Sequence, residues 1–327
     1  MKTLEGKVAV VAGATRGVGR GIAVMLGEAG ATVYCTGRST QKNRQLRQGK
    51  KRSPFALQFR PETVEQTAEL VTARGGKGIA VVMDHTDEEQ VSSLFKQIQR
   101  KQKKLNILVN DVWGGDELTE WGKAFWNLSM EKGLLMLQRS VFTHILNSRY
   151  AVPLMLDHGG LIVEVTDGDF LGYRGQFFYD LVKTFVIRIA FNLAFELSPH
   201  KIASLAVTPG FLRSEAMLEH FGVTEDNWQK AIKKDPNYAE SETPSYLGRG
   251  IVALATDPEI MQKSGKVFSS WRLAEEYGFT DLDGRKPNWG RHFRETEDER
   301  VIRVRELMLQ SHEDFIESCS KGLSRGK

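Results

Sequence analysis

Tyr179 and Lys183 have the residue types and the spacing that acid–base chemistry requires. On a helix, residues four apart lie on one face and one turn apart. A phenol titrates near pH ~10, and a neighbouring ammonium group lowers the pKa of the phenol by favouring its ionised form. The pair could therefore act as a general acid or base. Taken alone, this spacing also fits a surface helix with an aromatic–cation pair.

A glycine-rich segment near the N-terminus forms a second functional pattern. A short β-branched run, 8–11, predicts a buried strand, and an amphipathic helix follows and ends near Ala29. Between them lies the segment Gly13-Ala14-Thr15-Arg16-Gly17-Val18-Gly19. Backbone N–H groups and the dipole at a helix N-terminus attract phosphate, and glycines allow the tight turn and the approach of a pyrophosphate. The segment predicts a dinucleotide site.

The residues after the second predicted strand indicate which dinucleotide is bound. The strand 32–36 is followed by Gly37 and Arg38, where an NAD-binding chain would carry an acidic residue for the ribose hydroxyls. An arginine suits a 2′-phosphate, and Arg16 could contact the same group. We therefore predict NADP(H). A solvated loop arginine is the alternative interpretation of Arg38.

The composition is typical of a soluble globular chain. The protein has 327 residues, of which 41% are hydrophobic and 26% charged, with a net charge of +4. Because acids and bases are mixed, the charge does not require a nucleic-acid partner. No apolar run is long enough to span a bilayer, and the first residues lack an apolar signal core. The two cysteines, Cys35 and Cys319, suit a reducing cytoplasm.

Strand-like and helix-like segments alternate along the chain. We predict further strands at 78–83, 105–109, 161–166 and 202–207, and helices from Pro61 to about Arg74, after a capping box at 86–89, from Leu135 to about Asp157, and from about Phe178 to Ser198. This alternation predicts an α/β doubly wound parallel sheet, the Rossmann fold. Ligands of such sheets bind beyond the carboxyl ends of the strands. Five residues fall at those ends: Gly13, Asp84, Asn110, Thr166 and Gly210.

These residues in this order resemble the short-chain dehydrogenase/reductase (SDR) superfamily over about residues 7–265. Segments at 251–258, 264–267 and 277–285 look like the subgroup of dehydrogenase/reductase SDR family member 1. The resemblance implies an oxidoreductase in which Tyr179 is the acid/base and Lys183 binds the nicotinamide ribose. It also implies cofactor contacts from Gly13, Thr15, Arg16, Gly17, Val18, Gly19, Arg38, Asp84, Asn110, Lys183, Pro209, Gly210, Leu212 and Ser214.

The chain departs from the family pattern at three positions. The usual Asn-Asn-Ala-Gly is Asn110-Asp111-Val112-Trp113, and the helix asparagine that holds a relay water aligns with Ser140. The catalytic serine falls on Thr166 or Asp167, and the spacing of the subgroup favours Asp167. As a hydrogen-bond donor Asp167 would have to be protonated, whereas Thr166 donates as it is. Asp167 could instead be a turn residue at the strand end.

The remaining features concern the substrate and the flanking segments. Trp113, Tyr173 and Phe177 suggest an apolar carbonyl or alcohol substrate, with core packing as the alternative. We expect a main domain at 1–273, with a basic insertion at 39–60 and a substrate lid at 215–243 that carries Trp228. An extension follows at 274–327, where Val301, Val304, Leu307, Met308 and Phe315 predict an amphipathic helix that packs on the body or on a partner subunit.

The sequence thus favours an NADP(H)-dependent oxidoreductase of small carbonyl or alcohol compounds. We expect a cytoplasmic homodimer or homotetramer with no metal, nucleic-acid or membrane partner, and we interpret His144 as structural. One rival is a cofactor-binding scaffold without turnover, suggested by the altered serine and asparagine positions. A second rival is a nucleic-acid-binding protein that uses the basic residues at 42–52, whose binding would depend steeply on salt.

Overall fold

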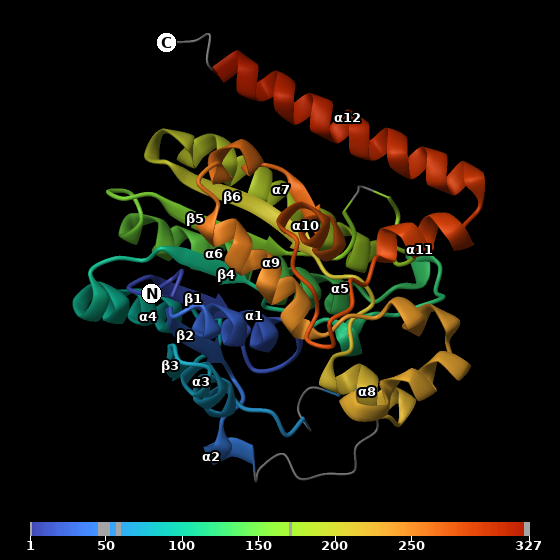
Figure 1. Cartoon of the computed structure of the whole chain (residues 1–327), viewed down its shortest axis with the longest axis horizontal. Coiled ribbons are helices and arrows are strands. Elements are labelled where there is room, and N and C mark those ends of the chain that lie inside the picture. Colours follow the sequence, from blue (N-terminus) through green and yellow to red (C-terminus); the bar gives the residue numbers. More distant parts are fainter. Residues whose placement is uncertain (1, 45–52, 57–59, 170–171, 324–327) are drawn as a thin grey trace.

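A seven-stranded parallel sheet forms the centre of the computed structural model, which describes residues 2–44, 53–56, 60–169 and 172–323 (Figure 1). The strands are β1 (Val8–Ala12), β2 (Thr32–Gly37), β3 (Lys77–Val82), β4 (Ile107–Asn110), β5 (Gly160–Val165), β6 (Ile202–Thr208) and β7 (Val267–Ser269). Their order is β3-β2-β1-β4-β5-β6-β7, and every neighbouring pair is parallel. The chain changes direction across the sheet between β1 and β4, so the predicted Rossmann fold is confirmed.

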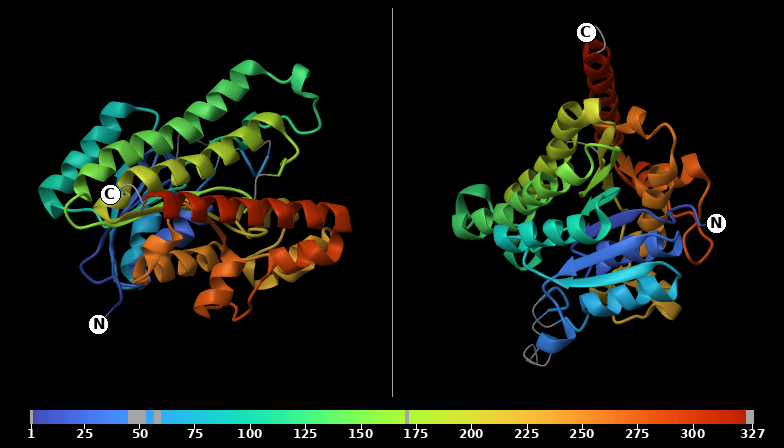
Figure 2. Two further views of the ribbon diagram at one scale, coloured as in Figure 1. Left: turned by 90° about the horizontal axis from the view of Figure 1, so that it is seen from above. Right: turned by 90° about the vertical axis from the view of Figure 1, so that its left-hand side faces the viewer.

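Helices cover both faces of this sheet (Figure 2). In chain order, the α-helices of the described residues are α1 (Gly17–Glu28), α2 (Gln41–Arg44), α3 (Val64–Ala73), α4 (Glu88–Gln102), α5 (Met130–Leu137), α6 (Thr143–Ala151), α7 (Phe177–Leu197), α8 (Glu215–Phe221), α9 (Pro244–Thr256), α10 (Ser270–Tyr277), α11 (Trp289–Thr296) and α12 (Glu299–Leu323), and α12 extends outside the helical layers (Figure 1). Because side chains alternate along a strand, Ala9 and Val11 of β1 pack with α1 and α9, while Val8 and Val10 pack with α4 and α6. Burial on both faces explains why β1 is apolar throughout.

Two helices begin at residues other than those predicted, because a capping side chain determines where each of them starts. Helix α3 begins at Val64 rather than at Pro61, since the Thr63 side chain accepts a hydrogen bond from the Gln66 N–H and Gln66 returns one. The N-cap of α4 is Asp87, whose carboxylate accepts from the N–H groups of Glu89 and Gln90. The predicted capping box that starts at residue 86 is therefore wrong.

The predicted helix from Leu135 to about Asp157 is also corrected. It starts earlier, at Met130, and is interrupted by a π-helical turn, Gln138–Phe142, before α6 ends at Ala151. Such turns leave backbone carbonyls without their usual helical partners and often occur at functional sites.

The C-terminal segment forms the predicted helix, α12, which contacts the body through only part of its apolar face. Val301, Val304 and Leu307 are exposed, whereas Arg305 and Ile316 are buried. Phe315 is half exposed and stacks on Phe191 of α7. Among the described residues, no helix combines the length and the apolar composition needed to cross a bilayer.

Candidate active site

Tyr179 and Asp167 are in direct contact at the carboxyl end of β5. The Gln176 side chain caps α7 by accepting from the Tyr179 N–H, which fixes the tyrosine in the first turn. The Tyr179 hydroxyl donates to Asp167 Oδ2 over 2.7 Å. Burial and the neighbouring Asp167 carboxylate raise the pKa of the Tyr179 phenol above its ordinary value. In this arrangement the phenol keeps its proton.

Thr166, the alternative to Asp167, has a different partner. Its hydroxyl donates to the backbone carbonyl of Lys183 over 2.8 Å, and the residue is buried. The hydroxyl thus ties β5 to α7. Of the two residues, Asp167 is the one whose side chain contacts the phenol.

Lys183 lies one turn beyond Tyr179, as the spacing predicted. Its Nζ is 4.3 Å from the centroid of the Trp113 ring and 5.6 Å from that of Tyr179. Burial lowers the pKa of the Lys183 ammonium, and the carboxylates of Asp167, Asp111 and Asp116 oppose that shift. The ammonium therefore sits between aromatic faces and carboxylates, next to the phenol.

The glycine-rich loop turns sharply between β1 and α1. Gly13 and Gly17 have φ angles of +91° and +57°, a region that favours glycine. A Cβ atom at Gly19 would lie 2.4 Å from the Gly13 carbonyl oxygen, so this crossing also requires glycine. Thr15 and Val18 of this segment are buried.

Two carboxylates that the sequence analysis missed bind the N–H groups of this loop. Gly17 N–H donates to Oε2 of Glu215, the first residue of α8, over 2.8 Å, and Glu215 Oε1 lies 3.4 Å from Arg20 Nη1. The Asp111 carboxylate accepts from the Gly19 N–H, and burial raises the pKa of Asp111 to about 7 against the pull of Lys183. Glu215 is 198 residues from Gly17, so no local pattern reveals the contact.

The candidate 2′-phosphate contacts lie at the end of β2. Arg38 is half exposed, and its Nη1 is 3.5 Å from Asp84 Oδ2. Burial opposes ionisation of Asp84, but Thr86 and Arg38 hold the pKa of Asp84 below its ordinary value. Arg16 donates to the hydroxyl of Ser39 over 3.0 Å and pairs with Glu62 at 3.1 Å. Ser39, directly after Arg38, is therefore a further candidate that the sequence analysis did not single out.

Asn110, predicted to line the cofactor groove, has its side chain in the interior instead. Its amide donates to Glu164 Oε1 of β5 over 2.8 Å and accepts from Asn147 of α6 over 3.0 Å. Glu164 also contacts His144 Nδ1 at 2.7 Å, and His144 Nε2 lies 3.2 Å from the Val112 carbonyl oxygen. The network joins β4 and β5 to α6, and His144 is part of it.

Ser140 lies on the π-helical turn. It is buried, and its Oγ makes no hydrogen bond within the described part of the chain. A buried hydroxyl with no protein partner is suited to bind a water molecule. In the same described part of the chain, no group of three or more His, Cys, Asp or Glu side chains is arranged to hold a metal ion.

Two aromatic rings pack against Tyr179, and further aromatic side chains are exposed. Trp113 meets the Tyr179 ring edge to face at 5.6 Å, and Trp121 lies 5.2 Å from it. Phe177 packs against Phe125 at 5.0 Å, and Tyr173 is 71% exposed. Trp121 and Phe125, both exposed, were not identified from the sequence because they lie in an irregular segment without periodicity.

The buried carboxyl group of Glu242 binds the loop that follows β6. Gly210 N–H donates to Glu242 Oε2 over 3.0 Å, and Ser270 donates to the same oxygen. Burial raises the pKa of Glu242 to about 8, against these two hydrogen bonds. Leu212 pairs with Glu242 in an isolated parallel bridge, and Ser214 caps α8 through Met217 N–H. Pro209, between β6 and Gly210, completes the predicted loop.

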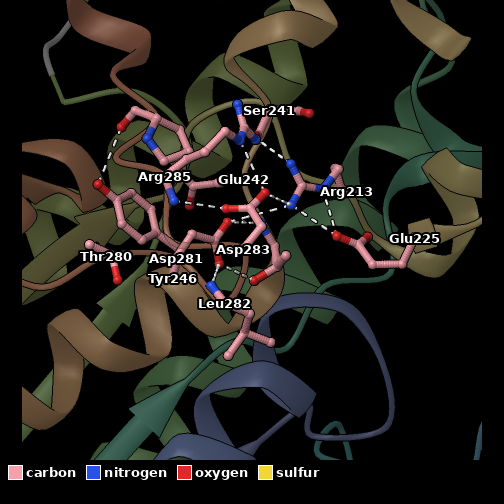
Figure 3. A network of polar contacts seen from close by, with 12 residues as sticks. Arg213, Glu225, Ser241, Glu242, Tyr246, Thr280, Asp281, Leu282, Asp283 and Arg285 are labelled. Atoms are coloured by element: carbon pink, nitrogen blue, oxygen red, sulfur yellow. Dashed lines mark hydrogen bonds and ion pairs between the residues drawn. The ribbon is translucent and has the colours of Figure 1, made fainter. Parts of the chain in front are cut away.

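The base of the predicted lid is a network of charges around the buried Arg213 (Figure 3). Arg213 Nη2 lies 3.0 Å from Asp283 and 3.7 Å from Asp281, and its Nε is 3.0 Å from Glu225. Trp228, a candidate substrate contact, is buried, and the guanidinium groups of Arg213 and Arg285 lie 4.3 and 4.4 Å from the centroid of its ring. The tryptophan therefore stabilises the lid from inside.

The basic insertion can be described only in part. The side chains of Arg44, Arg47, Lys50, Lys51 and Arg52 lie outside the described residues. At its end, Arg60 is buried and pairs with Glu62 at 2.5 Å and with Glu219 of α8 at 2.6 Å. The insertion and the lid are thus joined next to the glycine-rich loop.

Known proteins with similar sequences and structures are oxidoreductases. A family model described as enoyl-(acyl carrier protein) reductase matches residues 54–261. Dehydrogenase/reductase SDR family member 1 of Mus musculus is 36% identical, over 86% of this chain and 85% of its own. The structure of L-sorbose reductase from Gluconobacter frateurii, complexed with NADPH and L-sorbose, has a TM-score of 0.66 at 19% identity and covers 88% of this chain and 99% of its own. A short-chain dehydrogenase from Mycobacterium paratuberculosis bound to NAD has a TM-score of 0.61 at 19% identity, with coverages of 82% and 97%.

Proposed function

This chain belongs to the short-chain dehydrogenase/reductase family of oxidoreductases, and we propose that it transfers a hydride between NADP(H) and a ketone, aldehyde or secondary alcohol. The observation that carries the proposal is the meeting of Tyr179, Lys183 and Asp167 beside the glycine-rich loop, at the carboxyl edge of the sheet. Ligands of open parallel sheets bind at this edge.

The loop residues fit a nicotinamide dinucleotide. Gly17 N–H already binds an anion, since the Glu215 carboxylate stands where a phosphate oxygen would be held. Around Gly17 the nearest atom to an added Cβ is 4.0 Å away, so a side chain there would enter open space that a pyrophosphate needs. Gly13, Gly17 and Gly19 would hold that group by backbone contacts, with Pro209, Gly210 and Ser214 on the opposite side.

When bound, the dinucleotide supplies or accepts the hydride. Tyr179 exchanges the proton of the substrate oxygen, and Lys183 stabilises the phenolate that results when the proton leaves. Asp167, whose Oδ2 lies 2.7 Å from the Tyr179 hydroxyl, can in its protonated form be a second donor to the substrate oxygen. While Asp167 is ionised, its carboxylate opposes the phenolate, so the phenol gives up its proton only at higher pH.

We assign the preference for the 2′-phosphate to Arg38, with Arg16 and Ser39 as neighbours. No acidic residue at the end of β2 competes for the ribose, and arginine matches phosphate geometry. One structural relative is described with NADPH and another with NAD, so the fold accommodates either.

We further propose an apolar substrate, because the rings of Trp113 and Trp121 pack against Tyr179, and Phe177 packs against the exposed Phe125. Exposed apolar side chains on α5 to α7, among them Leu134, Phe142 and Phe185, support a homodimer or homotetramer. Light scattering at two protein concentrations tests that assembly.

Cys35, a buried free thiol, is consistent with the cytoplasmic location that we propose.

A substrate screen that follows NADPH absorbance tests the function. We expect oxidation of NADPH with apolar ketones or aldehydes and its loss in Tyr179→Phe. Tyr150→Phe is the matched control, because the Tyr150 hydroxyl donates to Glu88 of α4 over 2.7 Å at an exposed site, and this variant should retain activity. Wild-type rates that equal those of Tyr179→Phe across the screen would refute the proposal.

One observation favours the rival scaffold without turnover. Burial and Asp167 raise the pKa of Tyr179, which is the reverse of what a base in the free protein needs. The two functions separate in a single experiment. A scaffold binds NADPH in calorimetry with an affinity that Tyr179→Phe does not change, and it transfers no hydride to any carbonyl compound.

A further inference from the structure

The C-terminal helix α12 reaches the loop that carries Asp167. Arg305 Nη2 of α12 donates to Asp169 Oδ1 over 2.7 Å, and the two side chains are 8% and 2% exposed. The partners are 136 residues apart in sequence. Arg305 also lies 4.7 Å from the Phe293 ring of α11, so the guanidinium is packed on a second side as well.

Asp169 is two residues beyond Asp167, and hydrogen bonds from several other segments bind the backbone of this stretch. Arg174 Nε donates to the Asp167 backbone carbonyl, and Arg174 Nη1 lies 2.9 Å from Asp180 Oδ1 on α7. Gly168 N–H donates to Thr208 Oγ1 of β6 over 2.9 Å. These contacts come from the loop itself and its sheet neighbours. Arg305 adds an anchor from outside the nucleotide-binding sheet.

We propose that Arg305 and Asp169 are positioning residues, through which α12 sets the place of Asp167 against Tyr179. The proposal rests on the proposed function, in which Asp167 acts on the substrate oxygen. A nearly buried ion pair that loses one partner leaves the other charge desolvated and unpaired. Asp169 would then move toward water and carry the backbone at 167–169 with it. A shift of about 1 Å in a reacting group can cost about 10²-fold in rate.

Variants of Arg305 measure this effect with an accepted substrate. In Arg305→Met, we expect kcat to fall by about 10- to 100-fold, while KM and the NADPH dissociation constant change by less than about 3-fold. Arg305→Lys restores a cation and should recover part of kcat. Asp169→Asn has nearly the same shape and should lower kcat in the same way, which keeps the test valid if Arg305→Met does not fold.

The chain offers a matched control for simple loosening of the helix. Arg272 of α10 pairs with Glu313 of α12 at 2.9 Å, but this pair is about 40% exposed, whereas Arg305 and Asp169 are nearly buried. Arg272→Met should therefore leave kcat within about 2-fold of wild type. Equal losses of kcat in Arg272→Met and Arg305→Met would overturn the proposal, since they would show a general effect of α12 on stability.

Hydrogen exchange provides a readout that does not depend on turnover. The Gly168 amide, bonded to Thr208, should exchange at least about 10-fold faster in Arg305→Met and at the wild-type rate in Arg272→Met. If no substrate is ever turned over, the proposed function fails while this measurement still decides the positioning role. Unchanged exchange at Gly168 in both Arg305→Met and Asp169→Asn would refute it.

Discussion

Replacement of Asp167 by asparagine should shift the titration of Tyr179 by a measurable amount. The 2.7 Å contact between the phenol and Asp167 Oδ2 has the short distance of a charge-assisted hydrogen bond. Such bonds stabilise by about 1.5–3 kcal/mol, and one pKa unit corresponds to about 1.36 kcal/mol. The carboxylate opposes the phenolate, so its removal should lower the pKa of Tyr179 by about one to two units.

The assay is the pH profile of alcohol oxidation at saturating NADP⁺, in which the phenolate is the base. The limb that rises with pH should move to lower pH by about one to two units in Asp167→Asn, and turnover should survive because the amide still donates. Asp116→Asn is the matched control. That carboxylate also faces Tyr179 but is hydrogen-bonded to Trp113 Nε1 at 2.7 Å, so its loss should shift the limb less. A limb that stays in place in Asp167→Asn would refute the reasoning.

Four further outcomes are expected. Arg38→Asp should reverse or abolish a preference for NADPH over NADH, and equal affinities of the wild type in calorimetry would contradict the assignment. Lys183→Ala should abolish most hydride transfer and raise the apparent pKa of the phenol limb, since a nearby cation favours the phenolate; an unchanged profile counts against it. Glu215→Gln should bind NADPH about 2- to 5-fold more tightly, because a competing anion leaves the Gly17 N–H, whereas Glu219→Gln should not. Asp167→Ala should lose about 10²-fold in turnover and Thr166→Val little, and the reverse order would assign the donor to the threonine.

The fold and the central pair of the site could be predicted because both depend on short-range patterns. Alternating apolar strands and helices determine a parallel sheet, and a four-residue spacing on α7 brings Tyr179 and Lys183 together. The choice between Thr166 and Asp167 could not be made, because the chain leaves β5 at Val165 and the strand alternation no longer applies.

Contacts between residues that are far apart in the chain could not be predicted from the sequence. Trp228 lies in the predicted lid and was expected to meet substrate, yet it is buried and packs against Arg213 and Arg285. Glu215 binds the glycine-rich loop across 198 residues, and Asn110 is turned inward by Glu164. Such pairings depend on tertiary geometry, which local propensity does not encode.

The charge network around Arg213 also limits which fragments of this chain can fold on their own. The matched family region ends at residue 261, and all seven strands end by Ser269. A fragment that stops there keeps the complete sheet but lacks Asp281 and Asp283, two of the carboxylates that neutralise the fully buried Arg213 (Figure 3). Such a fragment leaves the buried guanidinium with Glu225 as its remaining carboxylate partner, and the loss of buried ion-pair partners costs several kcal/mol, a large part of the stability of a typical domain. Recombinant fragments and frameshifted chains that end before Asp281 should therefore aggregate or be degraded rather than form compact nucleotide-binding domains.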